Sequence, residues 1–268
     1  MKTTSFLFLI FLIFPCQASE FLRVGDTRSL GLGGAGVTHT FTFNPALLVL
    51  STNKQAGVDI FNRFNVSGLQ TLQASFIYSN DLLPAGINIS SFGNDAYRET
   101  CFMLAVGKQI NEMVTLGIAS TYLFIQSEGV DKNPSRLAID AGVVIKTVDK
   151  LLIGISILNF PSVNLTVRNE QFKQTPVYNL RTGFNWNIIE SCMLTSELIC
   201  SEESPLTVNM GVEYYPYSSF SLRAGLQDNF RMPTCGIGYV FSRFSFQLAT
   251  QFHPLLGTCT GLGLKALF

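Results

Sequence analysis

The sequence predicts an all-β fold: a transmembrane antiparallel β-barrel of about fourteen strands, with a short N-terminal segment plugging the lumen. Three observations predict it, namely a two-residue alternation of apolar and polar side chains, an apolar N-terminal stretch and a low content of charge. Between Leu206 and Tyr214, every second residue is apolar, and the residues between them include Asn209 and Glu213. Because successive side chains of a strand point to opposite faces, each such run is a strand with one apolar and one polar face. This is the pattern of a barrel with lipid outside and a polar lumen.

The composition supports a single barrel bathed in membrane lipid. Charged residues make up 13% of the 268 residues, whereas the chain has 23 Phe and 22 Gly. Lys+Arg and Asp+Glu both number 18, so the formal net charge is zero and we expect no nucleic acid as a partner. After the first twenty residues, no apolar run approaches the ~20 residues that a spanning helix needs.

The N-terminus predicts export. Lys2 is followed by an apolar stretch over residues 6–14 and by small residues near Ala18, which together are typical of a secretory signal peptide over residues 1–19. The alternative, a membrane anchor, needs a longer apolar stretch. The mature chain then divides into an N-terminal hatch segment, 20–53, and a barrel, 54–268. The predicted location is the outer membrane of a bacterial cell.

Turn signals divide the barrel into its strands. The expected strands are 55–66, 70–80, 84–92, 99–110, 113–127, 136–148, 150–159, 176–188, 190–202, 205–215, 218–229, 233–242, 243–253 and 257–268. Fourteen is an even number, as in single-chain bacterial barrels. Short links such as 111–112 and 242–243 largely alternate with longer ones such as 129–135 and 159–175. Short turns on the periplasmic side and longer outer loops give this alternation.

The charges of the expected strands sort to one face. Asp140, Arg181, Glu213 and Arg223 fall toward the lumen, and apolar residues such as Leu180, Leu222 and Phe244 fall toward lipid. An Arg at mid-depth on the lipid side would cost roughly 2–4 kcal/mol, so this sorting is informative. A soluble β-sandwich is the alternative, because it also alternates. In a sandwich, however, several of these charges would lie in a dry core.

A glycine-rich motif follows the signal peptide. Gly31, Gly33, Gly34 and Gly36 match G-x-G-x-x-G, but a dinucleotide site needs a strand before this motif and a helix after it. We therefore interpret the motif as a compact loop and expect no cofactor. His39 and His253 are the only histidines and lie far apart, so no metal site is expected. The chain has no G-x-S-x-G motif, and we predict that it is not an enzyme.

The same stretch carries a family resemblance. The run 28–37, RSLGLGGAGV, followed by 43–47, FNPAL, resembles the N-terminal signature of FadL-like outer-membrane proteins, a superfamily that includes PorV/PorQ-type proteins. The resemblance implies a fourteen-stranded barrel whose N-terminal segment folds into the lumen as a hatch. It also implies that Gly31, Gly33, Gly34, Gly36, Asn44 and Pro45 lie close to a bound ligand.

Glycines recur in the expected strands. They are Gly117, Gly142, Gly183, Gly211, Gly225, Gly236, Gly261 and Gly263. They leave room for an inserted segment to pack against the wall, or they relieve strain in a curved sheet. The sequence leaves both interpretations open.

Three functions compete at this point. The resemblance implies passage of small hydrophobic molecules, fatty-acid-like in chemistry, that bind near the hatch and leave through the barrel wall. A PorV/PorQ-like role in secretion or surface attachment would instead require secretion-system proteins as partners. A general diffusion porin would need a charged constriction, for which Asp140, Arg181, Glu213 and Arg223 are the candidates.

Overall fold

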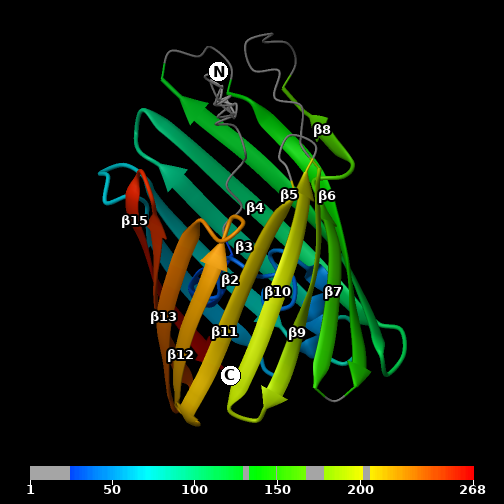
Figure 1. Cartoon of the computed structure of the whole chain (residues 1–268). Coiled ribbons are helices and arrows are strands. Elements are labelled where there is room, and N and C mark those ends of the chain that lie inside the picture. The colour runs from blue at the N-terminus through cyan, green and yellow to red at the C-terminus, as the bar shows by residue number, and fades with distance from the viewer. Residues whose placement is uncertain (1–24, 129–132, 149, 167–177, 202–205) are drawn as a thin grey trace, which may run out of the picture.

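A computed structural model describes residues 25–128, 133–148, 150–166, 178–201 and 206–268. Fourteen strands close into one antiparallel barrel, and the N-terminal segment, drawn in blue, lies within it (Figure 1). The predicted fold class and strand number are confirmed. The predicted signal peptide, 1–19, lies outside the described residues.

Most strands lie within a few residues of their expected bounds. They are β1 (Gln55–Asn62), β2 (Gln70–Tyr78), β3 (Ala85–Gly93), β4 (Tyr97–Gln109), β5 (Val114–Ser127), β6 (Ser135–Val148), β7 (Leu151–Leu158), β8 (Ser162–Asn164), β9 (Asn179–Ile189), β10 (Cys192–Ser201), β11 (Thr207–Tyr217), β12 (Phe220–Gln227), β13 (Met232–Phe241), β14 (Phe244–His253) and β15 (Gly257–Leu267). Each barrel strand pairs with its neighbour in the chain, except that β7 pairs with β9 across β8.

The barrel closes between its first and last strands. β1 and β15 pair antiparallel, from Gln55 opposite Leu267 to Asn62 opposite Thr260. Every strand of the ring therefore has two hydrogen-bonded neighbours, and a closed ring has no free edge.

The expected link 159–175 contains one additional strand, which is a correction to the sequence prediction. β8 pairs with residues 136–138 of β6, whereas β7 pairs with β6 no further than residue 141. Because β6 extends beyond the end of β7, its backbone groups are open there, and the returning chain pairs with them. This short strand lies outside the ring of fourteen.

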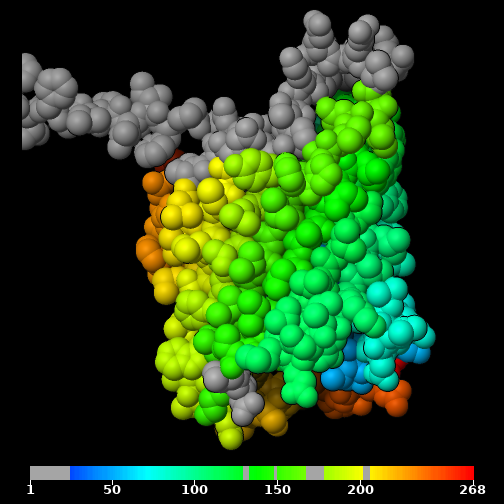
Figure 2. Space-filling model, turned by 90° about the vertical axis from the view of Figure 1, so that its right-hand side faces the viewer, coloured from blue at the N-terminus to red at the C-terminus, as the bar shows by residue number. Residues whose placement is uncertain are grey.

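The two faces of the wall differ as predicted. Phe244, Leu222 and Leu180 are 47%, 41% and 41% exposed on the outer face, whereas Asp140 and Glu213 are 0% exposed on the inner face. The β-sandwich alternative is therefore wrong, because it would bury these three apolar side chains between two sheets. Figure 2 shows one side of the wall as a continuous surface in which neighbouring colours follow the chain around the barrel.

The N-terminal segment contains two short helices. α1 (Thr27–Gly31) contacts β12 to β15, and the 3-10 helix η1 (Pro45–Leu50) contacts β4 to β6. Since these two groups of strands lie nearly opposite each other in the ring, the segment crosses the lumen. We call residues 25–53 the plug. Neither helix of the described chain has the length and apolar character needed to span a membrane.

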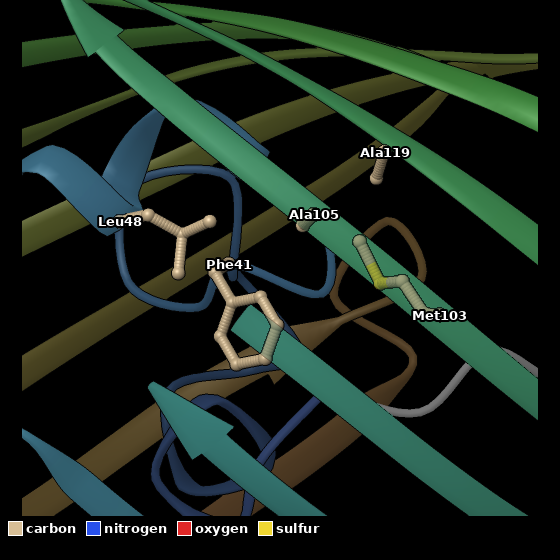
Figure 3. Close-up of a cluster of buried hydrophobic side chains, with 5 residues drawn as sticks. All are labelled: Phe41, Leu48, Met103, Ala105 and Ala119. Carbon is tan, nitrogen blue, oxygen red and sulfur yellow. The ribbon is translucent and has the colours of Figure 1, made fainter. Parts of the chain in front are cut away.

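A buried apolar cluster fastens one end of the plug. Phe41 and Leu48 of the plug pack against Met103 and Ala105 of β4 and Ala119 of β5 (Figure 3). All five side chains are at most 6% exposed. The two alanines keep the wall thin at this point, so that the larger plug side chains fit within the ring.

Candidate functional site

The candidate site is the contact between plug and wall, together with the cavities that the plug leaves on either side. Wall glycines make the contact possible. A Cβ atom on Gly117 would lie 2.2 Å from the Ala46 nitrogen, and one on Gly225 would lie 2.3 Å from the Gly33 nitrogen. Each of the eight wall glycines noted in the sequence would bring a Cβ within 4 Å of a plug atom. The structure therefore favours close approach of the plug as the reason for these glycines.

The glycines of the plug have a matching role. Gly33 and Gly34 have φ angles of +71° and +75°, a region that other residues rarely adopt. A Cβ on Gly33 would also lie 2.4 Å from the Met210 carbonyl oxygen, and a Cβ on Gly36 would lie 2.3 Å from the Phe43 ring. Gly31 packs against Gly236, where a Cβ would lie 3.4 Å from its Cα. The G-x-G-x-x-G motif thus permits close packing, with Gly31 and Gly33 against the wall backbone and Gly36 against the Phe43 side chain.

Asn44 joins the turn of the plug to the wall. Its side chain is fully buried; Oδ1 accepts from the Ala46 nitrogen (3.2 Å), and Nδ2 donates to the carbonyl oxygens of Val37 (3.0 Å) and Val143 (3.1 Å). Asn44 is the N-cap of η1, and Pro45 is its first residue, where a missing N–H costs nothing. Asn44 and Pro45 therefore set the geometry of the plug, and neither residue lines the outer pocket or the inner cavity described below.

Wall hydroxyl and carboxylate groups bind the backbone of α1. Thr234 Oγ1 accepts from the Gly33 nitrogen (3.0 Å) and donates to the Gly31 oxygen (3.1 Å). Asp59 of β1 accepts from both the nitrogen (2.9 Å) and the hydroxyl (2.6 Å) of Thr27. These bonds satisfy polar backbone groups that an inserted segment would otherwise bury without partners.

Glu197 of β10 anchors the loop after α1. Its Oε2 accepts from the nitrogens of Gly36 (2.5 Å) and Val37 (3.0 Å), and its Oε1 accepts from Arg181 Nη1 (2.7 Å). The guanidinium carbon of Arg181 in turn lies 3.9 Å from the centroid of the Phe43 ring. One buried carboxylate therefore links two strands and two parts of the plug.

Glu213 lies at the centre of a second cluster of charged side chains. It accepts from Arg28 of the plug (2.6 Å to Nη2) and from Arg223 of β12 (2.7 Å to Nε). Burial alone would lower the pKa of Arg28, but the adjacent Glu213 carboxylate raises that pKa above its usual value. Arg28 therefore remains charged and bound to the wall.

Among the described residues, an outer pocket and an inner cavity border the plug. The outer pocket, of about 450 Å³, lies at the barrel end away from Phe268. Its apolar lining residues are Leu30, Phe43, Phe61, Phe64, Ile199 and Met232, and Arg63 and Arg181 also face it. The inner cavity, of about 210 Å³, lies toward the other end and has a polar lining that includes His39, Gln55 and Lys265.

Comparison with solved structures places this architecture among known barrels. No protein-family model and no curated protein sequence matches the chain. The toluene transporter TbuX of Ralstonia pickettii superposes with a TM-score of 0.64 at 11% identity, over 93% of this chain and 100% of that one. The toluene transporter TodX of Pseudomonas putida gives 0.62 at 12% identity, over 92% and 98%. A FadL homologue of Pseudomonas aeruginosa gives 0.56 at 12% identity, over 91% and 98%. The chain has the FadL-type fold.

Within this FadL-type barrel, the four lumen charges predicted from the sequence lie in three separate groups. Glu213 and Arg223 form one ion pair, and Arg181 pairs with Glu197. Asp140 accepts from the hydroxyl of Thr121 (2.9 Å) and the nitrogen of Asn159 (2.7 Å). The structure therefore does not bring these charges into one constriction.

Sequence reasoning missed Glu197, Asp59 and Thr234 as anchors of the plug. All three occupy lumen-facing positions in the alternation of their strands, and this alternation is the one sequence signal that could have found them. Over the described ranges, no group of three His, Cys, Asp or Glu side chains lies as metal ligands would. Cys192, Cys200, Cys235 and Cys259 are free thiols.

Proposed function

We propose that this chain is a bacterial outer-membrane barrel that passes small hydrophobic molecules of the fatty-acid type, and that these molecules bind first in the outer pocket. The observation that carries the proposal is a pocket next to the plug that combines aromatic and aliphatic side chains with two guanidinium groups among other polar side chains. The fold supports it, because the barrels that superpose include proteins described as toluene transporters and as a monoaromatic hydrocarbon channel.

The apolar part of the outer pocket suits a hydrocarbon body. Phe43 of the plug and Phe61 of β1 line it, together with Phe64 of the following turn. A volume of about 450 Å³ lies within the ~300–1,000 Å³ usual for small-molecule sites. Aromatic rings bury large apolar areas, so an alkyl chain or aromatic ring in contact with them gains from leaving water.

The charged part of the pocket suits a carboxylate head. Arg63 stacks over the Phe92 ring, with 5.1 Å from its guanidinium carbon to the ring centroid, and burial lowers the pKa of Arg63. The Nε of Arg181 is buried without a hydrogen-bond partner among the described residues. A ligand carboxylate would supply the acceptor that these donors favour, since charge-assisted hydrogen bonds are stronger than neutral ones.

The diffusion-porin alternative is less well supported. A porin selects ions through charges that face open water. Here Arg181 pairs with Glu197 of the wall. Glu213 pairs with Arg223 and with Arg28 of the plug. Release of the ligand through the barrel wall and association with secretion-system proteins both stay predictions. Pull-down of secreted partners would test the second.

Titration calorimetry of the full-length protein with dodecanoate and with toluene tests the proposal. We expect dodecanoate to bind, and Arg63→Leu to weaken it about tenfold, since a hydrogen bond to a charged group contributes about 1.5–3 kcal/mol. Arg98→Leu is the matched control, because Arg98 pairs with Asp95 on the surface, where that aspartate side chain is fully exposed. The proposal is contradicted if the wild type binds neither ligand. If it binds toluene alone, the proposed ligand class of fatty-acid-type carboxylates is wrong and a neutral aromatic hydrocarbon takes its place.

A further inference from the structure

The two cavities of the lumen approach each other at one side chain. Among the described residues, Asp26 alone lines both the outer pocket and the inner cavity. Asp26 precedes α1 as its N-cap and is 5% exposed. The partition between the two cavities is therefore thin at this point, and a carboxylate occupies it.

Hydrogen bonds tie Asp26 to both sides of this partition. Its Oδ1 accepts from the nitrogen (3.0 Å) and the hydroxyl (2.8 Å) of Ser29, which lines the outer pocket. Its Oδ2 accepts from Nζ of Lys265 (2.5 Å), which lines the inner cavity. The row Ser29, Asp26, Lys265 thus runs from one cavity to the other.

Lys265 is the part of this row that can move without moving the plug. Its side chain is 27% exposed, whereas the Glu213–Arg223 pair is 1% and 3% exposed. The ammonium is a compact charge on a flexible four-carbon stem. The stem lies beside Gly57, where a Cβ would be 3.4 Å from Lys265 Cγ, so no wall side chain holds it there. The bonds of Asp59 and Glu197 to the plug do not involve Lys265.

The surroundings of the row are polar and suit hydrated ions. The inner cavity is lined on its wall side by Gln55, Gln73 and Ser75 of β1 and β2. Gln73 Nε2 also donates to the carbonyl oxygen of Gly25 (3.3 Å), which lines the outer pocket. Carbonyl, amide and hydroxyl oxygens can replace part of the water shell of a cation. When Lys265 withdraws, the Asp26 carboxylate is left without this partner. Arg28, which stays bound to Glu213, is the other charged side chain in the described lining of the inner cavity.

We propose that the row Ser29, Asp26, Lys265 closes a second, polar route along β1, β2 and β15, and that small hydrated cations pass along it when the Lys265 ammonium leaves Asp26. This inference rests on the proposed function only in placing the barrel in a membrane. It adds a conduction path for ions to the passage of hydrophobic molecules through the outer pocket.

Conductance of the full-length protein in planar bilayers bathed in KCl tests this route. We expect Lys265→Ala to raise the mean conductance about fivefold over the wild type. This factor corresponds to about 1 kcal/mol, the upper range for a partly exposed ion pair. The added current should be carried by K⁺ more than by Cl⁻, because Asp26 keeps its charge. Lys146→Ala is the matched control, since Lys146 is an exposed lysine near the same barrel end on β6, far from β15 in the ring.

Lys265→Met separates loss of charge from loss of volume, and we expect it to raise conductance as well. Wild-type conductance in both Lys265 variants, with the barrel folded, would overturn the proposal. An equal rise in Lys146→Ala would also overturn it, because the effect would then be one of general surface charge. These currents are measured without ligand, so failure to bind dodecanoate would affect the proposed function and leave the test of the ion route unchanged.

Discussion

Replacement of Glu197 by Gln should loosen the plug without disturbing the barrel. The substitution keeps the volume of the side chain but removes its charge. In the structure, one carboxylate accepts two backbone N–H groups of the plug and the guanidinium of Arg181. A neutral amide has one oxygen acceptor in place of two, and its NH₂ group would face donors.

The size of the effect follows from these contacts. Hydrogen bonds to charged groups contribute about 1.5–3 kcal/mol each, and removing one partner of a buried ion pair costs about 3–5 kcal/mol. Because the single amide oxygen of the Glu197→Gln side chain can still accept at one of the two sites, we expect plug docking to weaken by about 2–3 kcal/mol. This corresponds to a factor of about 30–150 in the docking equilibrium.

Reaction of an engineered thiol measures plug docking directly. Val37→Cys, in a background whose native cysteines are replaced by Ser, places a probe on the loop that Glu197 holds, at a side chain that is 1% exposed. With Glu197→Gln, the rate of labelling by a maleimide should rise by the same factor. Thr195→Val, at a buried lumen-facing position two residues away in the same strand, is the control. Unchanged labelling of Val37→Cys in the Glu197→Gln protein would refute the reasoning.

Three further outcomes are expected. Gly117→Ala should displace the plug, because the new Cβ would lie 2.2 Å from the plug backbone. Gly57→Ala is the control and should be tolerated, because its Cβ would meet the side chains of Ser75 and Lys265, and would meet the Leu264 carbonyl oxygen only at ordinary contact distance. The thiol-labelling rates of the two variants test this difference. Leu262→Arg, at a lipid-facing position, should lower the free energy of unfolding by roughly 2–4 kcal/mol in urea titration of the protein in lipid vesicles, and Leu255→Arg, 88% exposed in a turn, should have little effect. Plug docking should weaken as the pH falls from about 6.5 toward 3. Burial and the nearby Arg28 lower the pKa of His39 to about 3 in the docked plug, so between these pH values the released plug binds a proton that the docked plug does not. A labelling rate that does not change with pH over this range would contradict this prediction.

The fold could be predicted because a barrel repeats one local rule. Each side chain of a strand faces either the outside of the ring or its lumen, so alternation in the sequence predicts both the strand positions and their two faces. β8 was missed because its pairing depends on β6 extending beyond β7, which is a property of two strands together. The correct sorting of Asp140, Glu213 and Arg223 to the inner face follows from the same parity.

The site was predictable only in part. The glycine motif and the pair Asn44-Pro45 mark the plug in the sequence, because unusual backbone geometry requires particular residues. Their partners across the lumen carry no local signal. Glu197 and Met193 share the inner face of β10. Nothing near either residue indicates that Glu197 binds two backbone N–H groups of the plug, whereas the Met193 sulfur accepts from the Arg28 side chain. Which strand positions lie opposite the plug is fixed by the closed ring, not by the neighbours in the chain.

The position of the plug at the beginning of the chain constrains how the molecule is assembled. Its bonding partners are spread from Asp59 of the first strand to Lys265 of the last. A ribosome makes the plug before the barrel strands, yet the last of its contacts named here, Lys265, is synthesised more than two hundred residues later. The plug can therefore form its full set of contacts only when the ring is nearly complete, and until then water hydrates its polar backbone groups. Loss of β15 would open the ring beside β1 and would also remove Lys265 from Asp26, so a change in this strand would weaken the docking of the plug.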